Sequence, residues 1–392
     1  MLTNKSIFYV FFLSHKIRRR LMKKSVFILA IFLIIYLPSA SQESADFIKL
    51  QKVAVSKVPD TLIVPDLFSI TFDSKGNVFA FAGLQNGKEC FIVKFDKNLN
   101  YILRFGRDGR GPGEFKTTYS SPEDRLSVDK SNGDVYVTDY NPGKIVVFDN
   151  NGKHKEDIPY QRDFIKQLGY MSKVKVVGPG LFMARRRIRF FPVDAVIFSL
   201  RPPKIILSYP LDTLRIDVRV GSTMVTGPTE TCYGDNHFME TDSKHIVFGN
   251  SQKYKFHVYD IQGNKILEIE DPEKIMGSFK SKELKIIGEK WARIEKNSPV
   301  LFNKLMKQMK TRKNVIAAIK IDGKQIYVFP VRDDVTVNNK FPVEVYNLEG
   351  KILKRGFFKK IPDKIWKNFA FYKEYDDEYN PLIIKYKIMD FK

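Results

Sequence analysis

The chain alternates between short apolar runs and clusters of glycine, aspartate, asparagine and proline. One element recurs: an apolar run ends in an aromatic residue, Asp or Asn follows, and a turn leads into another short run. This pattern predicts β-strands joined by tight hairpins. The clear copies are Val93–Asn98, Val146–Gly152, Val258–Gly263 and Val345–Gly350, and weaker ones are Ile197–Ser199 and Lys385–Lys387.

The aromatic residues of these copies recur with a period near 50 residues. Their spacings are 53, 50, 61, 87 and 40, and the largest contains an extra stretch that is not β-like. A repeat of that length made of strands alone fits one blade of a propeller. We therefore predict an all-β fold, a six-bladed β-propeller with a small helical insertion; a β-sandwich is the alternative. The six aromatic residues are Phe95, Phe148, Phe198, Tyr259, Tyr346 and Tyr386.

A second element, a turn that begins with Asp, precedes an apolar strand in four of the repeats. Such uninterrupted apolar runs are typical of strands that are buried on both faces. The chain ends soon after the sixth aromatic residue, so we expect Phe47–Val55 to supply the outer strand of the last blade and to close the ring. The four turn-and-strand copies are Asp73–Phe79, Asp129–Val137, Asp242–Phe248 and Asp322–Val328.

Residues 273–312 interrupt the β pattern. Their apolar residues recur at steps of three and four, which predicts two short amphipathic helices rich in lysine. We expect an insertion that caps one propeller face; docking of a partner or of an anionic envelope surface is the alternative. The apolar positions are Ile287, Trp291 and Ile294, and then, after Pro299, Leu301, Leu305 and Met309.

The first 41 residues have the organisation of a signal peptide. Lys23 and Lys24 precede the apolar run Val26–Leu37, and small residues follow it, so we expect cleavage before Gln42 and a propeller over residues 46–392. The run has 12 residues, fewer than the roughly 20 of a membrane-spanning helix. An uncleaved membrane anchor is the alternative. Met22 is the better start, and residues 1–21 read as an extension upstream of it.

The formal charge of +22 is uneven along the chain. Residues 1–24 contribute seven of these charges, and residues 273–313 contribute an excess of eight. An exported protein seldom meets nucleic acid, so we expect no nucleic-acid partner and instead a protein, a glycan or another anionic ligand at the propeller face. The apolar N-terminal segment offers membrane association as an alternative localisation to the periplasm or cell envelope.

Residues 105–152 resemble an NHL-type propeller repeat. The resemblance rests on the glycine-rich segment Phe105–Phe115, followed in order by Asp129–Val137 and Lys144–Asp149. The other repeats are similar in skeleton to TolB-like six-bladed propellers that bacteria export. The resemblance implies blade architecture, and relatives include binding scaffolds, lactonases and lyases, so it does not fix a function. The residues of the repeat motif are Gly106, Gly109, Gly111, Gly113, Asp139 and Asp149.

The four glycines of this motif predict a tight crossover between adjacent blades. We expect Gly111 and Gly113 to have positive φ, which a β-branched residue resists. A phosphate cradle is the alternative, but such a loop normally leads into a helix. Here it leads to Pro122 and a strand, which favours the crossover.

The segment around residues 185–189 is the most unusual cluster of charge. On a strand, Arg185, Arg187 and Arg189 share one face, and three guanidinium groups can bind carboxylate, sulfate or phosphate. A solvated face or a charged edge strand is the ordinary alternative. The histidines form no metal-binding motif, so no cofactor is indicated. Cys90 and Cys232 fall in different repeats, and we expect them to be unpaired.

The sequence thus favours an exported propeller that acts as a binding or interaction scaffold. A propeller hydrolase or lyase with a metal ion on its axis is one alternative, and a membrane-anchored sensor domain is another.

Overall fold

The computed structural model describes residues 47–84, 89–116, 125–140, 143–159, 169–188, 191–210, 215–220, 223–228, 237–274, 277–290, 292–309, 315–331 and 340–389. The chain divides into two units, Met1–Asp46 and Phe47–Lys392. The predicted signal peptide, residues 1–41, lies outside the described residues. Among those residues, no helix is both long and apolar enough to cross a bilayer.

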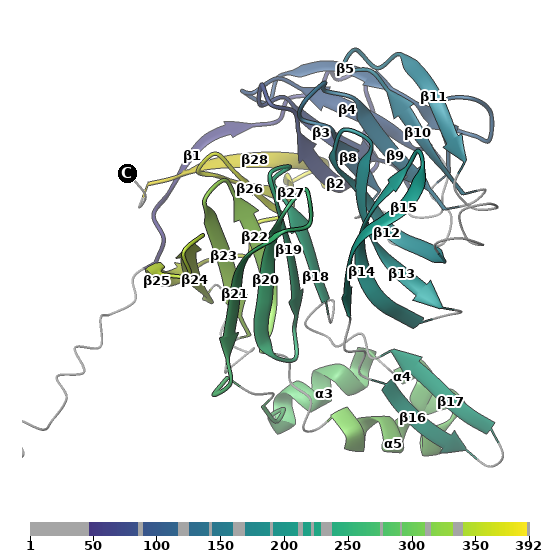
Figure 1. Cartoon of the computed structure of the whole chain (residues 1–392), viewed down its shortest axis with the longest axis vertical. Coiled ribbons are helices and arrows are strands. Elements are labelled where there is room, and N and C mark those ends of the chain that lie inside the picture. Colours follow the sequence, from purple (N-terminus) through teal and green to yellow (C-terminus); the bar gives the residue numbers. More distant parts are fainter. Residues whose placement is uncertain are drawn as a thin grey trace, which may run out of the picture. The chain divides into compact units, whose positions relative to one another are not determined.

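Most described strands of the second unit form six four-stranded antiparallel sheets (Figure 1). In five of these sheets the chain runs outward from the innermost to the outermost strand, and in all six the aromatic residue of the sequence repeat lies on the third strand from the axis. The predicted six-bladed, all-β fold is confirmed. Blade 1 is β2 (Leu67–Phe72), β3 (Val78–Ala82), β4 (Phe91–Phe95) and β5 (Tyr101–Phe105); blade 2 is β8 (Leu126–Val128), β9 (Val135–Asp139), β10 (Lys144–Phe148) and β11 (His154–Pro159); blade 3 is β12 (Tyr170–Gly178), β13 (Leu181–Ile188), β14 (Phe191–Leu200) and β15 (Pro203–Pro210).

The second half of the ring follows the same order until its last strand. Blade 4 is β18 (His237–Thr241), β19 (His245–Asn250), β20 (Tyr254–Asp260) and β21 (Lys265–Asp271); blade 5 is β22 (Ile316–Asp322), β23 (Gln325–Pro330), β24 (Phe341–Asn347) and β25 (Ile352–Phe358). Blade 6 is β26 (Lys364–Trp366), β27 (Phe369–Tyr375), β28 (Pro381–Ile388) and, outermost, β1 (Leu50–Val55).

The last blade is completed by the N-terminal strand, as the sequence predicts. β1 pairs antiparallel with β28, so that Leu50 lies opposite Ile388 and Val55 opposite Ile384. This pairing joins the two ends of the unit in one sheet. It covers the edge of β28 that would otherwise be unpaired, and it closes the ring.

Apolar clusters fill the spaces between neighbouring blades. Six such clusters occur among the described residues, one for each pair of adjacent blades around the ring. Sheets that pack face to face in this way bury both faces of their inner strands, which explains the continuous apolar runs. Examples are Phe81 with Val137, Val147 with Phe182, Ile197 with Phe248, Val258 with Ile319, Phe329 with Tyr372, and Phe371 with Phe72.

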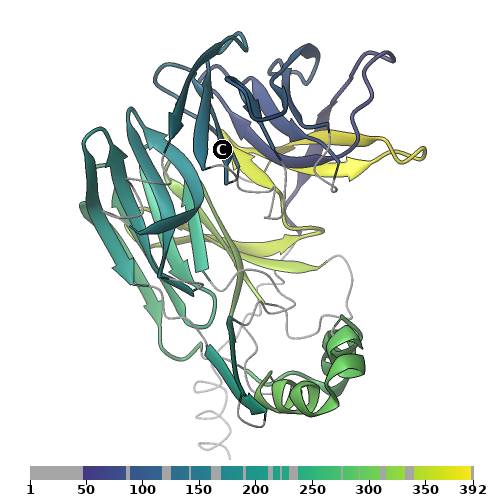
Figure 2. The same ribbon diagram turned by 90° about the vertical axis from the view of Figure 1, so that its right-hand side faces the viewer.

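Two insertions depart from the blade pattern (Figure 2). The hairpin of β16 (Arg215–Val220) and β17 (Thr223–Pro228) separates blades 3 and 4, and α3 (Ser281–Lys290), α4 (Ala292–Asn297) and α5 (Pro299–Met309) separate blades 4 and 5. The sequence predicts two helices here, but the first is divided into α3 and α4. It does not predict the hairpin, which contacts α5. The two insertions therefore form one layer from separate parts of the chain.

Candidate functional site

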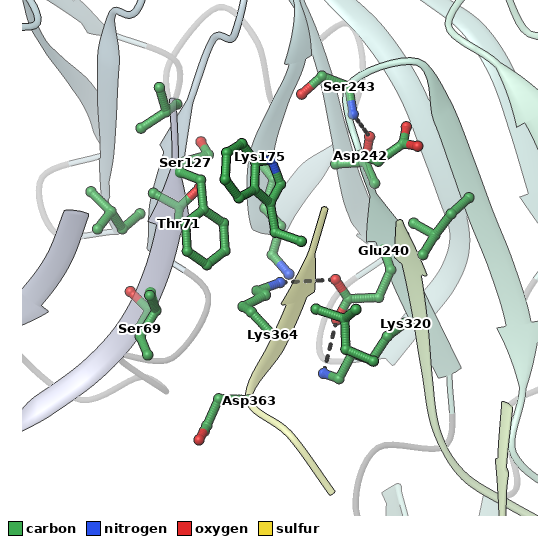
Figure 3. A pocket seen from close by; sticks show the side chains of 18 of the residues that line it. Ser69, Thr71, Ser127, Lys175, Glu240, Asp242, Ser243, Lys320, Asp363 and Lys364 are labelled. Carbon is green, nitrogen blue, oxygen red and sulfur yellow. Dashed lines mark hydrogen bonds and ion pairs between the residues drawn. The ribbon is translucent and has the colours of Figure 1, made fainter. Parts of the chain in front are cut away.

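A cavity of about 360 Å³ lies on the propeller axis. Each of the six innermost strands, β2, β8, β12, β18, β22 and β26, contributes residues to its lining (Figure 3). Because all six innermost strands line this cavity, side chains from every blade can contact the same small molecule there.

One repeat position supplies much of the polar lining. It lies two residues before the aspartate that begins each turn into the second strand. Because strand side chains alternate between two faces, residues at this position point the same way in each blade, here toward the axis. The residues are Thr71 before Asp73, Ser127 before Asp129, Glu240 before Asp242 and Lys320 before Asp322.

Three lysines surround one carboxylate in this cavity. Lys364 Nζ lies 2.9 Å from Glu240 Oε2, and Lys320 Nζ lies 3.4 Å from Glu240 Oε1. Lys175 extends from β12 toward Lys364 in Figure 3. The three cations come from blades 3, 5 and 6 and the anion from blade 4, so the cluster exists only in the closed ring.

The cluster shifts the pKa values of its own members. Burial favours the neutral form of Glu240, but the charges of Lys364, Lys320 and Lys175 outweigh it and hold the pKa of this carboxyl well below its usual range. Burial lowers the pKa of the Lys364 ammonium to about 8; Lys175 and Lys320 act in the same direction, and Glu240 opposes them.

The other charged groups of the lining leave the cavity with excess positive charge. Lys130 Nζ donates to the Asp242 carbonyl oxygen at 2.9 Å, and the Asp242 carboxylate lies 3.1 Å from His245 Nδ1. Lys373 Nζ donates to the Phe68 carbonyl oxygen at 2.6 Å. It also lies 3.5 Å from Asp363 Oδ1. The lining thus holds five lysines against three carboxylates.

Hydroxyl groups complete the polar lining. The Ser127 Oγ accepts the Val176 N–H at 3.0 Å. The Ser69 Oγ is buried and has no hydrogen-bond partner among the described residues. A buried hydroxyl without a partner is costly, and a ligand oxygen in the cavity would relieve that cost.

Of the predicted arginine cluster, only Arg185 has a described side chain, and it is not among the residues that line the cavity. Arg185 is buried on β13, whereas the side chain of Arg187 and all of Arg189 lie outside the described residues. Arg186, between them, donates from Nε to Asp194 Oδ1 at 2.7 Å and so serves the blade itself. An anion site at Arg185, Arg187 and Arg189 stays a prediction.

The glycine-rich segment connects blade 1 to blade 2. It contains β6 (Arg107–Asp108) and β7 (Glu114–Phe115), which pair in parallel. Gly106 and Gly113 have φ of +70° and +71°. The expectation for Gly111 is wrong, because its φ is outside the positive range; its N–H donates to Glu114 Oε2 at 2.8 Å instead. Gly109 has φ of +157°, and a Cβ there would collide with the Glu114 carboxylate.

The two aspartates of the repeat motif bind backbone N–H groups. Asp139 Oδ2 accepts the Lys116 N–H at 3.1 Å and thereby attaches the crossover to blade 2. Asp149 Oδ1 accepts the N–H groups of Asn151 and Lys153, each at 2.9 Å, and shapes the turn between β10 and β11. Both contacts are structural.

The histidines that can be described have local partners. His154 lies 2.9 Å from Asp157, and His257 Nδ1 lies 3.0 Å from the Tyr259 hydroxyl. Among the described residues, no three His, Cys, Asp or Glu side chains converge as metal ligands. Cys90 is buried and free, and Cys232 lies outside the described residues.

Comparison with known proteins identifies the fold. No protein-family model and no curated protein matches the chain. A structure from Bacteroides fragilis NCTC 9343, described as an exported protein, aligns with a TM-score of 0.51 at 10% identity over 90% of this chain and 98% of its own. A DUF4221 family member from Bacteroides vulgatus ATCC 8482 aligns with a TM-score of 0.50 at 13% identity over 86% and 98%. These similarities support the six-bladed propeller, whereas NHL or TolB-like membership stays a prediction.

Proposed function

We propose that this protein is an exported propeller that binds a small anionic ligand in its axial cavity and so acts as a binding scaffold of the cell envelope. The observation that carries the proposal is the convergence of Lys175, Lys320 and Lys364 on a single carboxylate, Glu240. One carboxylate cannot neutralise three ammonium groups, and a second anion in the cavity would be attracted strongly because the charged side chains are largely buried.

The cavity fits an anion better than a metal ion. Hard divalent cations bind several carboxylate or carbonyl oxygens together, and Zn²⁺ binds histidine or cysteine. The described lining instead presents ammonium groups to its centre. This composition favours the scaffold over a hydrolase or lyase with an axial metal.

The test compares two substitutions that change the cavity charge in opposite directions. Lys320→Met removes a cation, and Glu240→Gln removes the competing anion. Isothermal titration with sulfate, phosphate and citrate should give weaker binding to Lys320→Met and tighter binding to Glu240→Gln, each by about tenfold, the equivalent of 1.4 kcal/mol. Lys265→Met is the charge-matched control, because Lys265 lies on β21, the outermost strand of blade 4, and forms an exposed ion pair with Glu268. Equal affinities in all four proteins would reject the proposal.

Export is tested separately. The B. fragilis structure of similar fold is described as exported, and the N-terminal pattern has the form of a signal peptide. Sequencing the N-terminus of protein recovered from the envelope fraction should give a start at Gln42. A start at Met1 or Met22, with the protein in the membrane fraction, would support the membrane-anchored sensor instead.

A further inference from the structure

The axial cavity contains an amine, Lys364 Nζ, that contacts a carboxylate and lies beside other lysines. Lys364 Nζ is held by Glu240 Oε2 at 2.9 Å, and Lys320 reaches the other oxygen of the same carboxylate. The other two cavity lysines with described partners are bound differently: Lys130 donates to the Asp242 carbonyl and Lys373 to the Phe68 carbonyl. Lys364 therefore contacts a carboxylate beside other cations, as Lys320 does, and it makes the shorter of the two contacts with Glu240.

These surroundings are those of a nucleophilic lysine. An amine must lose its proton before it can attack a carbon atom, and burial beside other cations lowers the pKa of a lysine toward neutrality. Both conditions act on Lys364, whose pKa falls to about 8. Glu240, whose pKa is held low by the same lysines, is ionised and accepts a hydrogen bond from Lys364.

We propose that Lys364 forms an imine with the carbonyl group of an oxo acid, a small molecule with an aldehyde or ketone beside a carboxylate. This inference rests on the anion-binding function proposed above and names the ligand class. Lys175 and Lys320 bind the ligand carboxylate, which places the neighbouring carbonyl carbon near Lys364 Nζ.

The reaction balances without any further reagent. The lone pair of neutral Lys364 forms a bond to the carbonyl carbon, and the π electrons of the C=O bond move to oxygen, which takes a proton from a neighbouring ammonium. The nitrogen then loses its two protons as the C=N bond forms: one returns to the neighbouring amine that protonated the oxygen, and the other leaves with the hydroxyl group as water. One water molecule leaves for each imine made, and nothing is oxidised or reduced.

The experiment traps the imine by reduction. The full-length mature protein is incubated at pH 8 with pyruvate or glyoxylate and sodium cyanoborohydride, and intact mass and peptide mapping locate the adduct. We expect one adduct, on Lys364, and its loss in Lys364→Arg, which keeps the positive charge. Lys373→Arg, which changes another lysine of the same cavity, should retain it. Lactate has the carboxylate but no aldehyde or ketone. It should compete with the oxo acid for the cavity and reduce the yield of adduct, but form no adduct itself.

Three outcomes distinguish this inference from the proposed function. If adducts spread over surface lysines of the wild-type protein, or Lys364 is unmodified while sulfate and lactate still bind, the imine is rejected and anion binding stands. If neither adduct nor anion binding is found, both are rejected. Mapping on the wild-type protein keeps the test decisive even if Lys364→Arg does not fold.

Discussion

The interfaces between blades and the cavity on the axis are made by the same strands but have opposite compositions. Between blades the side chains are apolar and almost fully buried, as for Phe248 and Phe329. At the axis the lining contains five lysines and three carboxylates. The interfaces repeat the same chemistry six times, whereas the axial residue is a hydroxyl residue in blades 1 and 2, a lysine in blades 3, 5 and 6 and a glutamate in blade 4. The ring is thus encoded redundantly, whereas the charge of the axis depends on a few individual residues.

The largest effect is expected from breaking an interface between blades. Phe148 is buried, and its ring lies 5.2 Å from Phe105 and 6.2 Å from Phe115. Phe148→Ala should lower the free energy of unfolding by about 3–5 kcal/mol in urea denaturation, because the cavity left behind collapses incompletely. Ile102→Ala, at a position 43% exposed, should change it by less than about 0.5 kcal/mol. Similar losses for both would contradict the assigned burial.

A smaller effect is expected at the crossover between blades 1 and 2. A Cβ on Gly106 would lie 2.5 Å from Phe115 Cε1, at φ of +70°. Gly323 has φ of +60° but nothing within 4 Å of such a Cβ. Gly323→Ala should therefore cost about 1 kcal/mol for the backbone alone, and Gly106→Ala about 2–3 kcal/mol, because a collision is added. Equal costs in thermal unfolding would show that the crossover adapts to the added atom.

At the axis, the loss of the shared carboxylate should destabilise the fold less than the loss of Phe148. Glu240→Gln leaves three lysines without their common counter-ion and should cost about 1.5–3 kcal/mol. Adding Lys320→Met to that variant should recover part of the loss, since the remaining repulsion falls. A double variant as unstable as the two single losses added together would mean that the two residues do not interact.

The smallest effect concerns Asp157, which joins blade 2 to the crossover. Burial favours its neutral form, but Lys144, His154 and the Gly113 N–H outweigh burial and lower the pKa of its carboxyl. A lowered folded-state pKa stabilises the fold above the ordinary pKa of about 4, and that contribution is lost as the pH falls through the folded value. The stability difference between wild type and Asp157→Asn should therefore be full at pH 5 and shrink below pH 4. A stability difference that grows as the pH falls would contradict the lowered pKa of Asp157.

The sequence predicts the ring well because the ring is repetitive. Tight turns, apolar second strands and the aromatic residue on each third strand recur often enough to be recognised without a structure. The β16–β17 hairpin was missed because its strands resemble those of a blade. The conformation of Gly111 was missed because a glycine-rich loop does not show which of its glycines needs positive φ.

The axial site could not be recognised because each blade contributes so little to it. Lys320 and Glu240 occupy the same repeat position as Thr71 and Ser127, and no local motif surrounds any of them. The available signal was the register: when the turn aspartates are aligned, the residue two places earlier varies in charge, whereas its neighbours are apolar except for Thr241. Lys364 lacks even that aspartate, since Trp366 stands in its place.

The pairing of β1 with β28 has a consequence for the order of assembly. A ribosome or a secretion channel delivers a chain from its N-terminus, so β1 emerges first and its partner emerges last. Until β28 pairs with β1, blade 6 lacks its outermost strand and the ring that encloses the axial lysines is not closed. The circle is completed in a single late step, and accessory proteins that shield nascent chains would have their greatest effect on this protein just before that step.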